Sequence, residues 1–162
     1  MEWFYPASIE EAVEFVSKGV IPHAGGTGIL RSNPDRISEI VELSGIGLNS
    51  FLETDSEYII GSMLTFSNLV EKIKIVDKQH LLIQSLSKAA STLLRNRITI
   101  GGSVFLSPIW SDLMGPLLIL DSQLRVAGTE ERIFYKDFLA NRKMLQNRLI
   151  KSVIITRKTV HS

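Results

Sequence analysis

The stretch from Arg95 to Asp112 most constrains what this chain can fold into. It reads Arg-Asn-Arg-Ile-Thr-Ile-Gly-Gly-Ser-Val-Phe-Leu-Ser-Pro-Ile-Trp-Ser-Asp. An apolar β-branched run meets Gly101 and Gly102, whose backbones can take φ/ψ values that other residues avoid and can approach a ligand closely. We call Thr99 to Ser103 the second glycine stretch. It predicts either a turn whose N–H groups converge on an anion or only a bulge or sharp bend after a strand.

A similar run lies earlier in the chain. Ala24-Gly25-Gly26-Thr27-Gly28-Ile29, the first glycine stretch, follows a short predicted strand from Val20 to Ala24. Backbone amides in that context can bind phosphate, although the spacing matches neither the Rossmann nor the Walker pattern and a plain tight turn is an equal alternative. Two glycine stretches and the lone carboxylate of Asp112 together suggest a dinucleotide site, with the diphosphate in the middle and a ribose at one end. Asp112 alone could equally be a helix N-terminal charge.

Size and composition limit the classes of protein. The chain has 162 residues, 44% of them hydrophobic and 22% charged, which suits one globular domain or two small lobes that share a core. The start shows no secretory signal and no apolar run is long enough for a membrane span. The absence of cysteine excludes disulfides and a cysteine-ligated iron–sulfur cluster within these residues, and three scattered histidines offer no metal spacing. We expect a cytoplasmic protein without a metal site and without membrane contact.

The net charge of +1 conceals an asymmetry. Residues 1–131 carry ten Lys and Arg against sixteen Asp and Glu, whereas residues 132–162 carry eight against one. The basic end could face an anionic ligand or an acidic partner, or be only a solvated surface. No reader motif or aromatic-interleaved basic helix is present, so nucleic-acid binding is not expected.

Candidates for acid–base or nucleophilic catalysis are few. His23 adjoins the first glycine stretch but is more typical of a structural histidine. Arg95 and Arg97 could steady phosphates, yet arginines are also favoured at a helix C-terminus by the dipole. We therefore predict no catalytic residue, and any chemistry would be carried by a bound cofactor.

The pattern of elements predicts a small βαβ lobe over residues 1–46 and a second lobe over residues 47–162. Ser8 and Glu11 form a capping box that predicts a helix to about Ser17, and a short helix is expected over 27–32. The larger lobe has two hairpin signals. It also has a predicted helix from about Gln79 to Leu94 and a buried helix from Trp110 to Leu120, with Asp112 in its first turn.

The order of these motifs resembles the FAD-binding (medium) subunit of the molybdenum hydroxylases, the xanthine dehydrogenase and carbon monoxide dehydrogenase family. The resemblance covers essentially the whole chain. It is carried by four motifs: Phe4-Tyr5-Pro6-Ala7-Ser8-Ile9-Glu10-Glu11-Ala12, Ala24-Gly25-Gly26-Thr27-Gly28-Ile29, Leu94-Arg95-Asn96-Arg97-Ile98-Thr99-Ile100-Gly101-Gly102-Ser103, and Ser107-Pro108-Ile109-Trp110-Ser111-Asp112-Leu113.

The resemblance implies a two-lobed α+β fold, in which the larger lobe has a mixed or antiparallel sheet, and an FAD site between the two lobes. It assigns the diphosphate and flavin side to both glycine stretches, that is Ala24, Gly25, Gly26, Thr27, Gly28, Ile29, Thr99, Ile100, Gly101, Gly102 and Ser103. It assigns a ribose hydroxyl to Asp112 and a position against the cofactor to Ala89. It further implies that FAD takes electrons from an iron–sulfur (2Fe-2S) subunit, which a molybdopterin-binding large subunit fills, and passes them to NAD or another acceptor. The chain would then be the flavoprotein subunit of a multi-subunit oxidoreductase.

Three departures from the family pattern qualify this expectation. Gly28 stands where the family has Asp, and Ser103 replaces the common Asn. The family's subunit also continues into a C-terminal domain that covers part of the flavin, and this domain is absent from the sequence. The alternative function is therefore a non-catalytic assembly or regulatory module that keeps the fold but has lost stable FAD binding. A third possibility is an unrelated α+β protein in which both stretches are only turns.

Overall fold

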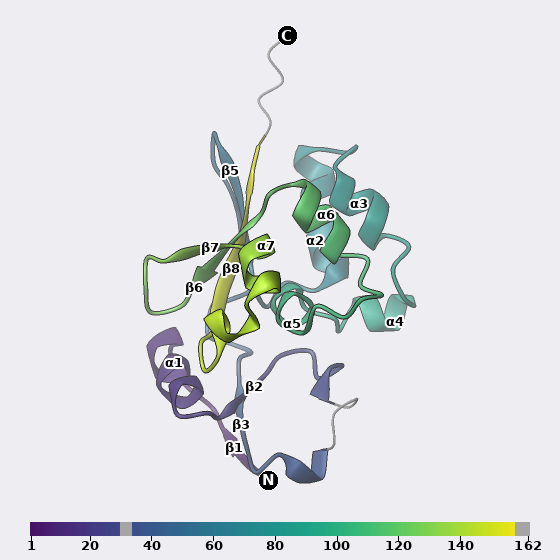
Figure 1. Cartoon of the computed structure of the whole chain (residues 1–162). Helices are drawn as coiled ribbons and strands as arrows, with labels where there is room; N and C mark the ends of the chain where they lie inside the picture. Colours follow the sequence, from purple (N-terminus) through teal and green to yellow (C-terminus); the bar gives the residue numbers. More distant parts are fainter. Residues whose placement is uncertain (30–33, 158–162) are drawn as a thin grey trace.

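The computed structural model describes residues 1–29 and 34–157, so the short helix expected over 27–32 lies largely outside the described residues. The chain forms two sheets, one at each end of the molecule in the view of Figure 1. The small sheet is parallel, in the order β1-β3-β2. It is built from β1 (Glu2–Phe4), β2 (Ile21–His23) and β3 (Glu39–Glu42). The helix α1 (Ile9–Ser17) connects β1 to β2, and a 3-10 turn, η2 (Pro34–Arg36), precedes β3.

The predicted capping box starts α1. The Ser8 hydroxyl accepts the N–H of Glu11 at 3.2 Å, and the Glu11 carboxylate accepts the N–H of Ala7 at 2.7 Å. Such caps typically contribute about 1 kcal/mol to a helix. Gly19 follows the helix with a φ of +92°, a left-handed value that favours glycine. Local sequence rules therefore account for this helix.

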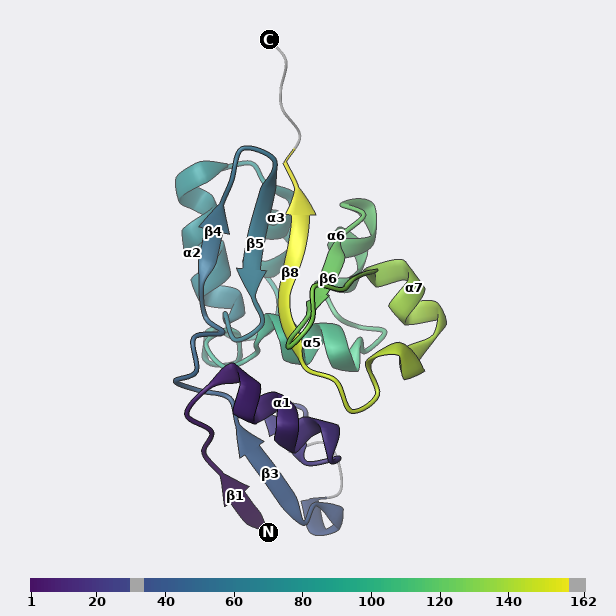
Figure 2. The same cartoon turned by 90° about the vertical axis from the view of Figure 1, so that its left-hand side faces the viewer.

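The large sheet is antiparallel, in the order β4-β5-β8-β6-β7 (Figure 2). Both predicted hairpins are present, as β4–β5 and β6–β7, and the C-terminal strand β8 is inserted between them. The strands are β4 (Phe51–Glu53), β5 (Glu57–Gly61), β6 (Gln123–Val126), β7 (Arg132–Phe134) and β8 (Ile150–Thr156). The combination of parallel and antiparallel sheets confirms the predicted α+β class.

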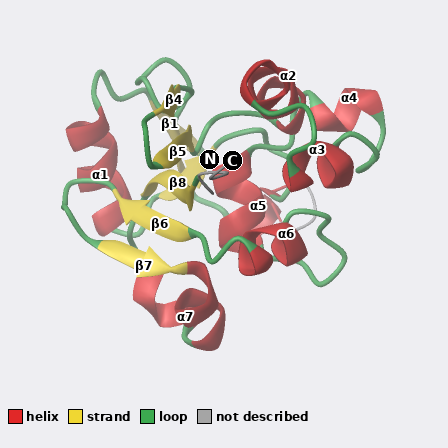
Figure 3. Ribbon diagram, turned by 90° about the horizontal axis from the view of Figure 1, so that it is seen from above, coloured by secondary structure: helices red, strands yellow, loops and turns green. Residues whose placement is uncertain are grey.

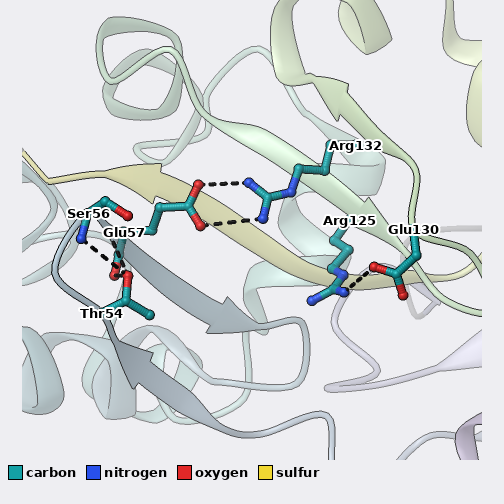
Figure 4. Close-up of polar contacts among 6 residues, drawn as sticks. All are labelled: Thr54, Ser56, Glu57, Arg125, Glu130 and Arg132. Atoms are coloured by element: carbon teal, nitrogen blue, oxygen red, sulfur yellow. Dashed lines mark hydrogen bonds and ion pairs between the residues drawn. The ribbon is translucent and has the colours of Figure 1, made fainter.

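Helices cover one face of the large sheet, as the view from above shows (Figure 3). They are α2 (Phe66–Val76), α3 (Leu81–Leu86), α4 (Thr92–Arg95), α5 (Ile100–Leu106) and α6 (Met114–Ile119), while α7 (Tyr135–Ala140) and the 3-10 turn η3 (Arg142–Leu145) follow β7. The other face carries ion pairs (Figure 4): Glu57 with Arg132 at 2.7 Å, and Arg125 with Glu130 at 2.6 Å. That face is polar at these positions, and the alternating apolar side chains of the strands face the helices.

Three expectations about the larger lobe are wrong. The long helix expected from about Gln79 to Leu94 is broken into α3 and α4, because Ala90 between them has a φ of +51°. The buried helix expected from Trp110 is only α6, which begins at Met114, so Asp112 lies before the helix rather than in its first turn. Gly101 and Gly102 follow a single β-bridge at Thr99 and lie inside the first turn of α5, not in a bulge after a strand.

The hydrophobic core has two clusters, and their boundary does not coincide with the boundary between the two sheets. The larger cluster lies between the large sheet and its helices. The smaller cluster is formed by α1, the small sheet and the segment after it, but Ala127 and Leu149 from the end of the large sheet complete it. The lobe boundary after residue 46 stays a prediction, and the small sheet shares its core with the larger lobe.

Within residues 1–29 and 34–157, no helix has the length and apolar character needed to span a bilayer.

Candidate cofactor-binding site

The first glycine stretch leaves the end of β2 as a loop that rises toward α5 (Figure 1). Gly26 has a φ of +74°, which only glycine adopts without strain. The backbone N–H groups of Gly25, Gly26 and Thr27 donate to no atom in the part of the chain that the structure describes. This loop therefore offers unpaired backbone donors, the kind of group that binds an anion.

The first glycine stretch contacts residues on both sides of the second stretch, although about seventy residues separate the two stretches. The Nε of Arg97 donates to the carbonyl oxygen of Gly25 at 3.2 Å. A Cβ on Gly25 would lie 1.6 Å from the backbone oxygen of Arg97, and a Cβ on Gly28 would lie 2.3 Å from the Cδ1 of Leu106. The first stretch thus packs against the residues on both sides of the second stretch, and glycine makes this approach possible.

The second glycine stretch begins α5. The Thr99 hydroxyl caps the helix and accepts the N–H of Gly102 at 3.3 Å. The N–H groups of Ile100 and Gly101 donate at 2.8 Å to carbonyl oxygens of the turn after β5. A Cβ on Gly101 would meet the Cβ of Ser62 in that turn at 2.6 Å. These amides already have partners, so the expected turn of converging unpaired N–H groups is not formed here.

Asp112 lies in the exposed segment between α5 and α6. The Ser103 hydroxyl of the second stretch lies 3.1 Å from that of Ser111, which also accepts the N–H of Leu113 at 3.3 Å. The Ser85 hydroxyl of α3 donates to the backbone carbonyl of Asp112. These contacts fix the backbone around Asp112 and leave its carboxylate on the surface, where it contacts neither glycine stretch among the described residues.

Ser107 anchors the start of the same segment. It ends α5 in the left-handed region, with a φ of +37°, and its hydroxyl lies 2.8 Å from the Tyr135 hydroxyl. Burial raises the pKa of Tyr135, against the opposing effect of the Ser107 hydrogen bond. The phenol therefore stays neutral and holds the chain where it turns toward Asp112.

Ala89 lies in the turn between α3 and α4 and is buried in the larger core. The Nη1 of Arg95 donates to the carbonyl oxygens of Ala89 at 3.1 Å and Ala90 at 2.9 Å, and its Nη2 donates to the Thr92 hydroxyl at 2.9 Å. Arg95 therefore holds this turn, and Ala89 belongs to the same core cluster as Ile100 of the second stretch.

His23 and Glu42 support the first stretch from below. Their side chains, 18% and 15% exposed, meet at 2.7 Å between Nδ1 and Oε2, and the other oxygen of Glu42 accepts the N–H of Ser44 at 2.9 Å. Burial alone would raise the pKa of Glu42, but the hydrogen bonds from Ser44 and His23 together outweigh it and lower that pKa. The pair orients His23 beside Gly26.

Other features of the surface do not add to this arrangement. Among the described residues, no three His, Cys, Asp or Glu side chains are grouped as metal ligands. A surface hollow of about 410 Å³ lies at the far end of the large sheet, lined by Leu120, Gln123, Phe134 and their neighbours. None of the predicted site residues lines it, so we regard the glycine stretches as the candidate site.

Some residues of this region were not expected from the sequence. The buried Ser62 hydroxyl, beside Gly101, has no hydrogen-bond partner in the described part of the chain. Leu106 fills the space that a side chain at position 28 would take. No sequence signal marks these two residues, because their positions depend on contacts between distant segments.

Comparisons with known proteins show the family of this chain. The profile of the family described as the FAD binding domain in molybdopterin dehydrogenase matches residues 1–157. Among curated proteins, indole-3-acetaldehyde oxidase of Zea mays is 24% identical over 170 residues, which cover 94% of this chain and 12% of that protein. FAD is thus the cofactor of the matched family, as the resemblance implied.

Solved structures show the same fold. Quinoline 2-oxidoreductase from Pseudomonas putida 86 superposes with a TM-score of 0.87 at 18% identity, over 99% of this chain and 60% of that chain. CO dehydrogenase from Oligotropha carboxidovorans superposes with a TM-score of 0.84 at 22% identity, over 98% of this chain and 59% of that chain. The chain therefore spans about 60% of the length of these similar structures. With the family profile matched over 157 of its 162 residues, the chain belongs to the FAD-binding domain family of the molybdopterin dehydrogenases.

Proposed function

We propose that the chain is the FAD-binding component of a molybdenum hydroxylase-type oxidoreductase and that the two glycine stretches hold the dinucleotide. The observation that carries this proposal is the contact of Gly25 with Arg97, two residues before the second stretch, together with the unpaired N–H groups on the first stretch. Such amides suit a diphosphate, which needs several donors in a small space. When bound, FAD would supply the electron-transfer chemistry.

The residues fit this group in distinct ways. On the first stretch, the N–H groups of Gly25, Gly26 and Thr27 would bind the diphosphate. On the second, whose first amides are already bonded, the hydroxyl of Ser103 would contribute instead, and the orphaned hydroxyl of Ser62 beneath Gly101 marks further unmet hydrogen-bonding capacity there.

The nucleotide and flavin ends are assigned by position. The exposed carboxylate of Asp112 would accept a ribose hydroxyl, for which the contacts of Ser85 and Ser111 hold the backbone in place. Ala89 would lie against the cofactor through its backbone, which the hydrogen bond from Arg95 fixes. Ile29 and Thr99 to Gly102 complete the proposed lining.

In the whole enzyme, the chain would hold FAD between an electron donor and an acceptor. We propose an iron–sulfur (2Fe-2S) subunit as the donor, a molybdopterin-binding large subunit behind it, and NAD or another acceptor. These 162 residues have no cysteine to ligate a cluster, so under this proposal the ligands of the iron–sulfur cluster lie outside them. A cytoplasmic location belongs to the same proposal.

The second candidate, a module that has lost stable FAD binding, is favoured by one observation. Gly28 offers no carboxylate, and the Leu106 side chain already occupies the space beside it. A first stretch without a carboxylate at position 28 would bind FAD with lower affinity and would leave the fold unchanged.

One experiment separates the two candidates. The purified chain is mixed with FAD and passed through gel filtration, and the flavin spectrum that co-elutes is measured together with the dissociation constant. We expect the flavin to be retained. Asp112→Asn should weaken the affinity for FAD about tenfold, which is the effect of one hydrogen bond to a charged group. Asp121→Asn is the matched control, because its exposed carboxylate pairs with Lys136. No retained flavin, and no affinity at high FAD concentration, would favour the module without cofactor.

A further inference from the structure

Two basic side chains flank Gly26 in the first glycine stretch. A Cβ at position 26 would lie 3.0 Å from the Nε2 of His23 and 3.8 Å from the Nη2 of Arg97. Because residue 26 is glycine, the space between an imidazole and a guanidinium stays open. It adjoins the unpaired N–H groups of the same loop.

Arg97 and Arg95 differ in what their guanidinium groups bind. Arg95 donates to two carbonyl oxygens and one hydroxyl, so it is used in the fold. Arg97 donates through Nε to Gly25, and its Nη atoms have no acceptor in residues 1–29 and 34–157. The Nε contact lays the guanidinium across the first stretch, and the remaining donors, permanently charged, stay available for an anion.

His23 is held in one orientation by neighbours from two strands. Glu42 on β3 binds its Nδ1 at 2.7 Å, and Trp3 on β1 contacts the ring edge-to-face at 5.0 Å between centroids. These contacts leave Nε2 as the nitrogen that faces Gly26. The fold therefore holds the His23 imidazole in a fixed position beside Gly26, near the guanidinium of Arg97.

The geometry points to a basic notch, formed by His23, Gly26 and Arg97, that binds the diphosphate of the dinucleotide. This inference rests on the proposed function and adds to it the side chains that contact the diphosphate. Arg97 contributes most of the attraction, because a guanidinium bonded to a phosphate oxygen makes a charge-assisted hydrogen bond. Glycine at 26 is needed to keep the notch open, and Arg95 takes no part.

The test compares three ligands on the purified chain: FAD, ADP, which has the diphosphate without the flavin, and riboflavin, which has the flavin without phosphate. Arg97→Gln should weaken FAD and ADP by about 10- to 100-fold, the size expected for a charge-assisted hydrogen bond, and leave riboflavin unchanged. The affinity for FAD should also depend less on salt concentration in the variant than in wild-type protein. Arg125→Gln, on the opposite face of the large sheet (Figure 4), is the matched control and should change none of these.

Arg97→Gln also removes the hydrogen bond from Arg97 to Gly25, so a second variant that keeps this hydrogen bond is needed. Gly26→Ala keeps both basic groups and fills the space between them, so it should weaken ADP as well as FAD. The thermal midpoint of each variant is recorded, because alanine at positive φ carries strain of its own. A weakened ADP complex in a variant that remains folded supports the notch.

The outcomes separate this inference from the proposed function. If wild-type protein binds FAD and both variants bind FAD and ADP as tightly, the notch is wrong and the flavoprotein function stands. If wild-type protein retains no FAD but binds ADP in a manner that depends on Arg97, the notch stands and the flavoprotein function fails. Binding of none of these ligands by wild-type protein overturns both.

Discussion

The two glycine stretches have similar sequences and use glycine for different purposes. The first is a loop in which Gly26 has a positive φ and the amides remain unpaired. The second is the first turn of α5, in which the amides of Ile100 and Gly101 are bonded to the turn after β5. There, glycine serves packing, since a side chain at 101 would overlap Ser62.

The difference teaches that a Gly-Gly pair does not by itself identify a phosphate-binding loop. What matters is whether its N–H groups have partners in the protein. In this chain the first stretch has the unpaired donors, and Arg97 and Leu106, on either side of the second stretch, hold it in place. Substitutions in each stretch should therefore have different consequences.

The largest effect is expected for Gly25→Ala, which tests whether the close contact of Gly25 with Arg97 is needed for stability and for FAD binding. The new Cβ would fall 1.6 Å from the Arg97 carbonyl oxygen, a backbone atom that cannot move aside. We expect a loss of about 3 kcal/mol in the free energy of unfolding, together with loss of FAD affinity. Urea denaturation measures the first and fluorescence titration the second. Gly115→Ala in α6 is the control, because nothing lies within 4 Å of its Cβ position. Equal stability of the two variants would contradict the close contact.

Gly101→Ala tests the packing purpose of the second stretch. Its Cβ would lie 2.6 Å from the Ser62 Cβ and 2.9 Å from the Ser62 carbonyl oxygen. A shift of α5 by a few tenths of an ångström can relieve part of this overlap, so we expect a smaller loss, about 2 kcal/mol by urea denaturation. Ser62→Gly should restore part of the stability of Gly101→Ala. An Ala variant as stable as wild-type protein would show that α5 is not packed as described.

Gly28→Asp tests the coupling of Gly28 to Leu106. The aspartate would displace the end of a half-exposed leucine side chain rather than backbone. We expect a destabilisation of about 1 kcal/mol that largely disappears in the Leu106→Ala background. A double-mutant cycle of unfolding free energies measures this coupling. Additive effects of the two substitutions would mean that Leu106 does not occupy the space of a side chain at 28.

The smallest effect concerns pH and the support under the first stretch. The pKa of Glu42 is lowered in the fold, so its contribution to stability is present above the unfolded value of about 4.3 and is lost as pH falls through the lowered value. We expect the contribution to be under about 1 kcal/mol. Unfolding free energies measured from pH 7 to pH 3 should show a weaker decline in Glu42→Gln than in wild-type protein. A steeper decline in the variant would reverse the sign assigned here.

Local patterns predicted much of the fold. The capping box at Ser8 and Glu11 and both hairpins of the large sheet depend on neighbours within a few residues, and each is present. The Thr65 hydroxyl likewise caps α2, as its position before an apolar run indicates. These elements are encoded by short-range hydrogen bonds that a single sequence reveals.

The elements that were wrongly predicted depend on distant contacts. The break at Ala90 is stabilised by Arg95, whose guanidinium binds the carbonyl groups that the break leaves without helical partners. Gly101 enters a helix because its N–H is taken by Ser62, far earlier in the chain. Periodicity and propensity do not contain this information. For the same reason, the sequence indicated the glycine stretches as site residues but not which of them keeps its donors unpaired.

The shared smaller core has a consequence for folding. Ala127 and Leu149 lie among the side chains of α1 and the small sheet, and a Cβ on Gly128 would lie 3.4 Å from Val13 of α1. Without these contacts from the larger lobe, the small sheet and α1 would leave part of their apolar surface uncovered. We therefore expect the small sheet to reach its full stability only after the β6–β7 hairpin and β8 have formed. During synthesis it would then wait until the residues of β8 have been made, and the melting of the two sheets would be a single cooperative event.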